Sequence, residues 1–267
     1  MRSGGDEHLR AVIAGALAAS GLAEASLVLS RVSAGGADRV VEIRADAQIT
    51  PASMIKVPIA AELAASWAEG RSAPGDLVAV GAANMTHNDA PSPLVPGYRA
   101  RLEELGRLML TRSDNVATNM LVDVLGRERI NARCRQLGLQ ATAVRRKLSG
   151  SLPLIDDPEA TGRNAHPAAD AALLFEAIAL ERAPGSAWLS QTLAAAEWNG
   201  KLSRGLQPGD RFAHKTGDTD EVSHDGGILT TAEGSRYVLV VYAPGAAPEG
   251  DDDSRLTRLM RALRPSL

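Results

Sequence analysis

The sequence predicts a mixed α/β fold of the α+β type, in which terminal helices flank one five-stranded antiparallel sheet that carries an inserted all-helical subdomain. Three observations predict this fold. β-Rich runs occur only near the two ends of the chain, each end also carries a helical pattern, and the long middle section reads as helices and loops. The 267 residues are therefore expected to form a single domain over 1–267, with a sheet subdomain of about 1–49 and 201–267 and a helical subdomain of about 50–200.

The first part of the chain is expected to supply one helix and two strands. The helix covers about residues 6–19, and Gly21 ends it. The runs "SLVLSRV" (26–32) and "RVVEIRA" (39–45) read as strands, and the intervening "SAGGAD" predicts a hairpin turn at Gly35 and Gly36.

The remaining elements follow from periodicity. The most periodic helices of the middle section are "RLEELGRLMLTR" (101–112), "NVATNMLVDVLG" (115–126), "RERINARCRQLG" (127–138) and "PAADAALLFEAIALE" (167–181). Strands are expected at "RFAHKTG" (211–217), "DGGILTT" (225–231) and "RYVLVVYAP" (236–244), followed by a closing amphipathic helix at "SRLTRLMRALR" (254–264).

Composition excludes several classes of function. The net charge of −3 offers no basic footprint for a nucleic acid, and no apolar run is long enough to cross a membrane. Cys134 is the only cysteine, so neither an intramolecular disulfide nor a cysteine-based zinc site can form. The run "AVIAGALAASGLAEA" resembles a secretion signal only weakly, because Asp6 and Glu7 precede it; we expect a cytoplasmic protein or one expressed without its leader.

The stretch "TPASMIKV" (50–57) places a serine and a lysine three residues apart at the expected start of a helix. Thr50 is a good N-cap and Pro51 suits the first helical position, which makes Ser53 the third helical residue. Lys56 then lies on the same face, one turn away. The pair offers a hydroxyl nucleophile, an amine that could take its proton and a free backbone N–H that could bind an oxyanion.

A Ser-x-x-Lys pair also arises by chance, and two further stretches decide between chemistry and chance. "RSDNVATN" places Ser113, Asp114 and Asn115 between two helices, where one of them could simply be an N-cap. "AHKTGDTD" ends a strand with Lys215, Thr216 and Gly217. Only four of the 29 basic residues are lysines, and two of the four fall in these motifs, which favours a role that arginine cannot fill.

With these three motifs, the chain resembles the penicillin-recognising serine hydrolases and, within them, the class A β-lactamases. The separations of 60 residues from Ser53 to Ser113 and 102 from Ser113 to Lys215 fit the class A range, and the predicted element order matches that β-lactamase/transpeptidase-like fold over essentially the whole chain. The resemblance implies an enzyme with no cofactor and no metal, acting on a small-molecule substrate such as a β-lactam, peptide or ester.

The resemblance also implies roles for individual residues. Ser53 would attack a carbonyl and form an acyl-enzyme, with Lys56 as its general base or proton relay and Ser113 passing the proton to the leaving nitrogen. Asn115 would bind the substrate side-chain amide, while Lys215 and Thr216 would bind its carboxylate. Gly217 completes the motif, and the oxyanion would lie between the backbone N–H groups of Ser53 and Asp218. Burial beside the charge of Lys215 would lower the pKa of Lys56 enough for a base.

The sequence departs from class A enzymes in the deacylating half of this machinery. It has no Glu-x-x-Leu-Asn run, and Ser-Gly-Ser at 149–151 stands where the water-activating glutamate is expected. The nearest acids are Asp156, Asp157 and Glu159, which a reshaped loop could bring inward. Without such a base the acyl-enzyme should be long-lived.

The expected walls of the cleft are also unusual. His224 and Asp225 fall near the place of an arginine that those enzymes use, and "NMTHNDAPSPL" is expected to wall the opposite side with His87, Asn88 and Asp89. The roles of His87, His214 and His224 stay open. A Ser-His-Asp triad is set aside, because the chain has no Gly-x-Ser-x-Gly and no histidine has an identified serine partner.

Three functions remain open. The first is a serine hydrolase that acts through acyl-Ser53 on a β-lactam or a related amide or ester. The second is a D-alanyl peptidase or acyl-transferase, for which a missing glutamate is natural. The third is a binding or sensing module that is acylated once. The sequence leaves the true substrate and the oligomeric state undetermined.

Overall fold

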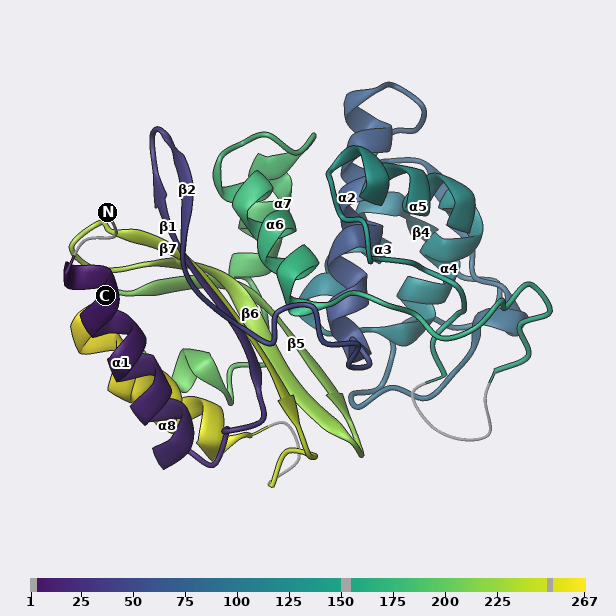
Figure 1. Ribbon diagram of the computed structural model, residues 1–267. Coiled ribbons are helices and arrows are strands. Elements are labelled where there is room, and N and C mark those ends of the chain that lie inside the picture. The colour runs from purple at the N-terminus through teal and green to yellow at the C-terminus, as the bar shows by residue number, and fades with distance from the viewer. Residues whose placement is uncertain (1–3, 150–154, 249–251) are drawn as a thin grey trace.

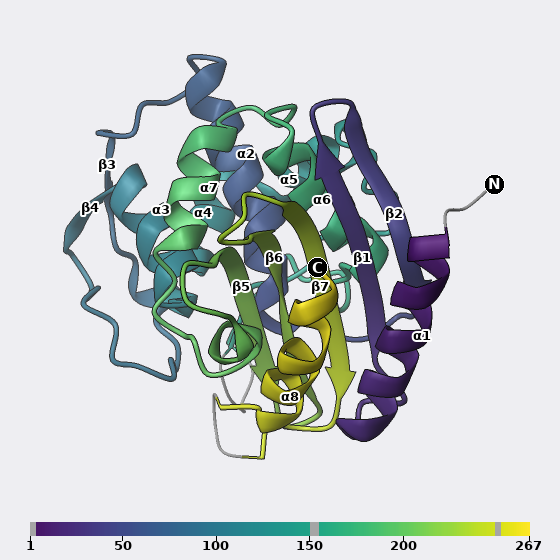
Figure 2. The ribbon, with the colours of Figure 1, turned by 90° about the vertical axis from the view of Figure 1, so that its left-hand side faces the viewer.

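The structure is a computed structural model that describes residues 4–149, 155–248 and 252–267. Its centre is a five-stranded antiparallel sheet with the strand order β2-β1-β7-β6-β5 (Figures 1 and 2). The strands are β1 (Ser26–Ser33), β2 (Gly36–Ile43), β5 (Arg211–Thr219), β6 (Val222–Thr230) and β7 (Arg236–Pro244). The sheet is therefore built from both ends of the sequence, and the predicted fold class is confirmed.

Helices cover both faces of the sheet. The two terminal helices, α1 (Gly4–Ala19) and α8 (Ser254–Leu263), lie side by side on one face, where Figure 2 shows them in front of the strands. On the opposite face lie α6 (Ala168–Ala179) and α7 (Ser186–Ala194), with α2 (Lys56–Ala68), α3 (Leu102–Thr111), α4 (Asn115–Leu125) and α5 (Arg127–Gln136) beyond them (Figure 1).

Side chains of the central strands point alternately to the two faces of the sheet, so the hydrophobic core has two parts, one on each face. Leu239 and Val241 of β7 belong to the cluster that packs under α1 and α8. Val238, Val240 and Tyr242 of the same strand belong to the larger cluster that joins the sheet to the inner helices. Both faces of β7 are thus buried, as expected for a central strand covered on two sides.

The middle section contains one feature that the sequence analysis did not predict. A two-stranded ribbon pairs β3 (Leu77–Ala79) with β4 (Arg99–Arg101), so the insert is not purely helical. Strands of three residues are too short to leave a period-two pattern. The predicted boundary between a sheet subdomain and a helical subdomain stays a prediction. Helix α6, which falls in the predicted helical subdomain, packs directly on β1 and β7 of the sheet.

Cys134 lies inside the helical core, where burial raises the pKa of its thiol to about 12. Its position fits a small apolar packing residue. None of the described helices has the length and apolar character needed to cross a membrane.

Two buried histidines predict that the folded state is sensitive to acid. Burial lowers the pKa of His166 to about 3 and that of His224 to about 4, from 6.5. As the pH falls from 6.5 towards these values, the unfolded chain binds protons that the folded chain does not, so the free energy of unfolding decreases. Shifts of this size correspond to roughly 3–5 kcal/mol for each histidine.

Urea unfolding across this pH window checks the expectation. The variant His166→Asn, His224→Gln keeps a hydrogen-bonding atom near the Thr142 hydroxyl and the Thr50 carbonyl, which the two imidazoles contact. Its stability should fall less steeply with acid than that of the wild type. An equally steep decrease of the unfolding free energy in both proteins would contradict the assignment of acid sensitivity to His166 and His224.

Candidate active site

Ser53 lies in a 3₁₀ turn, Ala52–Ile55, which leads into α2. The predicted helix start is therefore wrong in detail. Thr50 is not the N-cap; Pro51 stands at the cap of the turn, and α2 proper begins at Lys56. The N–H of Met54 bonds to the carbonyl of Pro51 at 3.0 Å, and Ala52 adopts a left-handed φ of 47°, which is a strained conformation for a residue with a side chain.

Lys56 is fully buried beneath this turn. Its amine donates to the carbonyl of Ser113, to Ser113 Oγ at 3.0 Å and to Asn115 Oδ1 at 2.8 Å. Burial, and secondarily the charge of Lys215, holds the pKa of Lys56 well below its usual 10.5, whereas Asp114 and Asp89 act in the opposite direction. An environment that disfavours the ammonium form makes this amine a better proton acceptor than an exposed lysine.

Ser113 joins the two lysines. Its hydroxyl oxygen lies 3.0 Å from Lys56 Nζ and 3.0 Å from Lys215 Nζ, and its backbone has a left-handed φ of 59°. Asp114, rather than Ser113, caps α4 by accepting a 2.8 Å hydrogen bond from the N–H of Ala117. Capping by Asp114 leaves the Ser113 side chain free to point at the amines. Burial lowers the pKa of Lys215 to about 8.

Asn115 is held on three sides. In addition to the Lys56 contact, its Nδ2 donates to the carbonyl of His87 at 2.9 Å, and its backbone N–H donates to Asn88 Oδ1 at 2.5 Å. The predicted wall segment around His87 and Asn88 thus lies against the start of α4. The role of Asn115 in binding a substrate amide stays a prediction, because both polar atoms of its side chain already have partners.

Strand β5 brings the third motif to Ser53. A Cβ added to Gly217 would lie 3.1 Å from the backbone nitrogen of Ser53 and 3.2 Å from that of Met54. Real Cβ atoms rarely approach a backbone atom so closely, so a glycine at this position allows the strand to lie directly against the serine turn. Thr216 precedes it and Asp218 follows it on the strand edge.

Asp218 has a partner that the sequence analysis missed. Lys201 Nζ donates to both carboxylate oxygens of Asp218 at 2.6 Å and to the carbonyl of His224 at 3.1 Å, and its side chain is fully buried. Burial raises the pKa of Asp218, although the charge of Lys201 opposes the shift. The rarity of lysine was the available signal, since three of the four lysines lie buried around this site.

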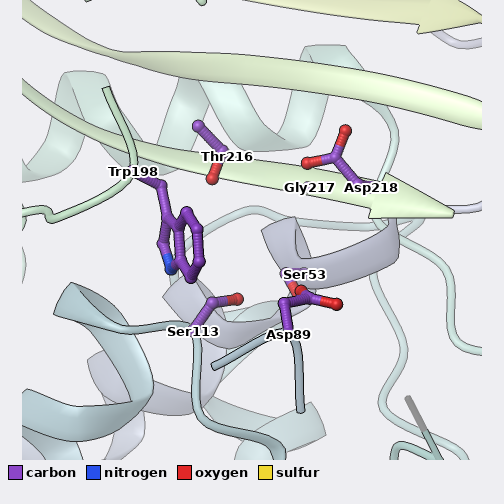
Figure 3. Close-up of a pocket in the computed structure, with 7 residues that line it drawn as sticks. All are labelled: Ser53, Asp89, Ser113, Trp198, Thr216, Gly217 and Asp218. Atoms are coloured by element: carbon purple, nitrogen blue, oxygen red, sulfur yellow. The ribbon is translucent and has the colours of Figure 1, made fainter. Parts of the chain in front are cut away.

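These segments enclose a small polar pocket (Figure 3). Its lining residues come from the serine turn, the wall segment, the Ser-Asp-Asn turn and β5: Ser53, Asp89, Ser113, Trp198, Thr216, Gly217 and Asp218. Trp198 was not predicted; its Nε1 donates to the carbonyl of Arg112 at 2.9 Å and so fixes the ring. Five of the eight sequence-predicted residues therefore line one pocket, and Lys56, Asn115 and Lys215 lie close behind it.

None of the acids suggested as a replacement for the missing glutamate lines the pocket. Asp157 accepts from Arg127 through both oxygens at 2.7 Å, and Glu159 also pairs with Arg127. Asp156 is exposed to solvent. Within the Ser-Gly-Ser stretch only Ser149 belongs to the described residues, and its hydroxyl accepts from the N–H of Ile155 at 2.8 Å.

The prediction that no histidine has a serine partner is wrong, because His214 contacts Ser203. Its Nδ1 lies 2.7 Å from Asp225 Oδ1, and its Nε2 lies 3.0 Å from Ser203 Oγ and 3.1 Å from Asn199 Oδ1. None of these residues lines the pocket, but they tie the segment that contains Lys201 to strands β5 and β6. We therefore regard His214 as a positioning residue.

His224 also lies behind the pocket wall. Its Nε2 bonds to the carbonyl of Thr50 at 2.8 Å, and its ring stacks on Tyr242 with centroids 4.2 Å apart. His87 is exposed. Across residues 4–149, 155–248 and 252–267, no group of three His, Cys, Asp or Glu side chains is arranged to hold a metal ion.

Comparisons with known proteins identify the family and match the fold. The model of the Beta-lactamase enzyme family matches residues 7–263. A β-lactamase from Sphaerobacter thermophilus superimposes with a TM-score of 0.80 at 23% identity, covering 97% of this chain and 95% of that one.

Two structures of PBP-A are similar as well. One has a TM-score of 0.76 at 26% identity, covering 90% of this chain and 88% of that one. The other is a PBP-A mutant in an acyl-enzyme complex with penicillin G, with a TM-score of 0.80 at 23% identity and 96% coverage of both chains. The search of curated proteins gave no match. The family match over residues 7–263 shows that this chain is a serine hydrolase of the β-lactamase enzyme family.

Proposed function

We propose that the protein cleaves a β-lactam, or a related amide or ester, through an acyl-enzyme formed at Ser53. The observation that carries the proposal is the buried amine of Lys56, the residue that follows the turn of Ser53; this amine lies 3.0 Å from the Ser113 hydroxyl oxygen. A low pKa suits this amine to remove the Ser53 proton as Ser53 Oγ attacks the carbonyl carbon.

The same contacts provide a route for the proton. As the bond from Ser53 Oγ to carbon forms and the bond from carbon to nitrogen breaks, the proton moves from Ser53 to Lys56. Ser113, which contacts both Lys56 and Lys215, gives its own proton to the leaving nitrogen and recovers one from Lys56. The oxyanion is proposed to bind the backbone N–H groups of Ser53 and Asp218; the close approach of Gly217 to the backbone nitrogen of Ser53 supports this proposal.

We further propose that deacylation is slow. In the described part of the chain the carboxylates that line the pocket are Asp89 and Asp218, and Lys201 holds Asp218 through both oxygens. The acids of the loop that follows Ser149 are paired with Arg127 or exposed. None of these engaged or distant acids offers the positioned base that rapid hydrolysis needs, which leaves Asp89 as the one candidate of the described pocket.

Intact mass spectrometry with penicillin G and a chromogenic cephalosporin tests this proposal. We expect about one equivalent of colour release per protein and an adduct that persists after the burst. Continuous colour release without a lasting adduct would contradict slow deacylation. Asp89→Asn would then show whether Asp89 activates the water.

Transfer of the acyl group to an amine is a second candidate, favoured by the engagement of Asp218 with Lys201 and by the similarity to PBP-A. An attacking amine needs less activation than water. If this reaction operates, adding a D-amino acid should shorten the lifetime of the adduct and yield the corresponding amide, and a D-Ala-D-Ala peptide should release D-alanine. An unchanged lifetime, with no D-alanine released, would leave hydrolysis as the reaction.

A further inference from the structure

The turn between α3 and α4, which carries Ser113, has an unusual backbone. Ser113 has a left-handed φ of 59°, and a residue other than glycine keeps such a conformation only where its surroundings hold it in place. The position of its hydroxyl depends on this conformation, because Ser113 Oγ lies 3.0 Å from Lys56 Nζ and 3.0 Å from Lys215 Nζ. A small change in the turn would therefore move the proposed proton donor away from both amines.

The loop that follows α7 braces this turn. Helix α3 ends at Thr111, and the last carbonyl groups of a helix have no partner within the helix. The backbone N–H of Glu197 donates to the carbonyl of Thr111 at 2.9 Å, and Trp198 Nε1 donates to the carbonyl of Arg112 at 2.9 Å. Two consecutive residues of the loop therefore cap the two residues that immediately precede Ser113.

The Trp198 contact is the one that a single substitution can remove. Glu197 bonds through its backbone, and its exposed side chain reaches Arg112 Nε only at 3.4 Å, which stabilises little. The Trp198 bond, in contrast, depends on the indole N–H. The same ring lies in the pocket between Thr216 and Ser113, so one side chain both lines the pocket and caps the end of α3 (Figure 3).

We propose that Trp198 is a positioning residue for the proton donor: its indole N–H caps α3 at Arg112 and thereby holds the Ser113 hydroxyl between the two lysine amines. The proposal rests on the proposed acyl-enzyme at Ser53 and adds a residue to the departure of the leaving group. Substrates whose leaving atom needs a proton depend on Trp198 for that step. Substrates whose leaving group departs as a stable anion do not.

The two kinds of leaving group separate this role from a general effect on the enzyme. When the bond from the carbonyl carbon to a β-lactam nitrogen breaks, the nitrogen takes the proton of Ser113, and Ser113 recovers a proton from Lys56. When the bond to a 4-nitrophenyl oxygen breaks, the oxygen keeps the electron pair and leaves as an anion, and the proton taken from Ser53 stays on Lys56 until solvent removes it. A displaced Ser113 hydroxyl should therefore slow the first departure and not the second.

Penicillin G and the 4-nitrophenyl ester of phenylacetylglycine test this difference, because both carry a phenylacetamido group next to the reacting carbonyl. The second-order rate constant of acylation is measured with each reagent, by intact mass spectrometry and by release of nitrophenolate. Trp198→Phe keeps an aromatic ring and removes the N–H. Its ratio of penicillin to ester rate should fall by about tenfold, part of the roughly 10²–10⁴-fold contribution of a positioned proton donor. Because the comparison is a ratio within one variant, a general loss of activity cancels.

A second substitution shows whether Trp198 acts through Ser113. Ser113→Ala should itself lower the ratio by about a hundredfold or more. In that background Trp198→Phe should lower it no further, because the hydroxyl that the indole positions is already absent, whereas independent residues would have additive effects. Tyr98→Phe is the matched control: it removes the hydrogen bond from an exposed aromatic side chain to Glu104 at 3.0 Å and should leave the ratio unchanged.

The outcomes separate the two proposals. If penicillin G acylates Ser53 but Trp198→Phe keeps the wild-type ratio, or lowers it equally in the Ser113→Ala background, the positioning role is wrong and the proposed function stands. If the ester acylates the wild type and penicillin G does not, the inference is wrong and the proposed function stands for the ester alone. If neither reagent labels the wild type, or both label Ser53→Ala equally well, the proposed function fails and the inference fails with it.

Discussion

Ser53→Ala is expected to abolish covalent labelling by penicillin G and to reduce turnover of any reactive ester by at least about a thousandfold, because no other hydroxyl replaces a lost nucleophile efficiently. The substitution removes one oxygen from a half-buried position in the 3₁₀ turn and leaves the turn's backbone contacts intact. Its melting temperature should therefore stay close to that of the wild type. Intact mass spectrometry and stopped-flow measurement of colour release provide the readouts.

Ser203→Ala is the matched control for this prediction. Ser203 is the serine that contacts His214, which in turn contacts Asp225, so it is the alternative nucleophile that the geometry offers. We expect Ser203→Ala to keep its adduct and its rate of acylation. Loss of labelling in this variant, with labelling retained in Ser53→Ala, would reverse the assignment.

Lys56→Arg is the second substitution for which a large loss is expected. Arginine keeps the positive charge but does not release its proton at accessible pH, so the Ser53 proton would have no acceptor. Removing a general base typically reduces a rate by about 10²–10⁴-fold. In the wild type, acylation should accelerate as the pH rises through the pKa of Lys56, which burial places well below 10.5; the variant should lose this dependence.

Lys147→Arg is the control for the change of side chain. Lys147 pairs with Asp123 at 2.8 Å on the surface and has no contact with the pocket, so arginine can keep the ion pair. Acylation in this variant should match the wild type. A Lys56→Arg protein that acylates at the wild-type rate would exclude Lys56 as the base.

Most of the fold was predictable from the sequence because its elements are long and periodic. The pattern of α8 and the apolar runs of β1 and β7 identify one helix and two central strands without any tertiary information. The ribbon of β3 and β4 escaped prediction because it is held by pairing between segments about twenty residues apart rather than by a local pattern.

The three motifs located the site because the types of their residues and the spacing between them are visible in the sequence. Ser53, Ser113 and Gly217 meet at one pocket, as their order along the chain implied. The predicted start of α2 was wrong because a 3₁₀ turn without a side-chain cap precedes the helix at Ala52. Strand β5 packs against this turn through Gly217. Trp198 and Lys201 could not be placed from the sequence, since they reach the site through hydrogen bonds to Arg112 and Asp218, distant in the chain.

The most direct test of the account is to identify the acylated residue. The protein would be quenched with acid after reaction with penicillin G, digested, and its modified peptide sequenced by tandem mass spectrometry. The account predicts one modified side chain, Ser53, within the peptide that contains Pro51 and Lys56. Acylation of Ser113 or Ser203 instead, or of no residue at all, would contradict the central claim that Ser53 is the nucleophile.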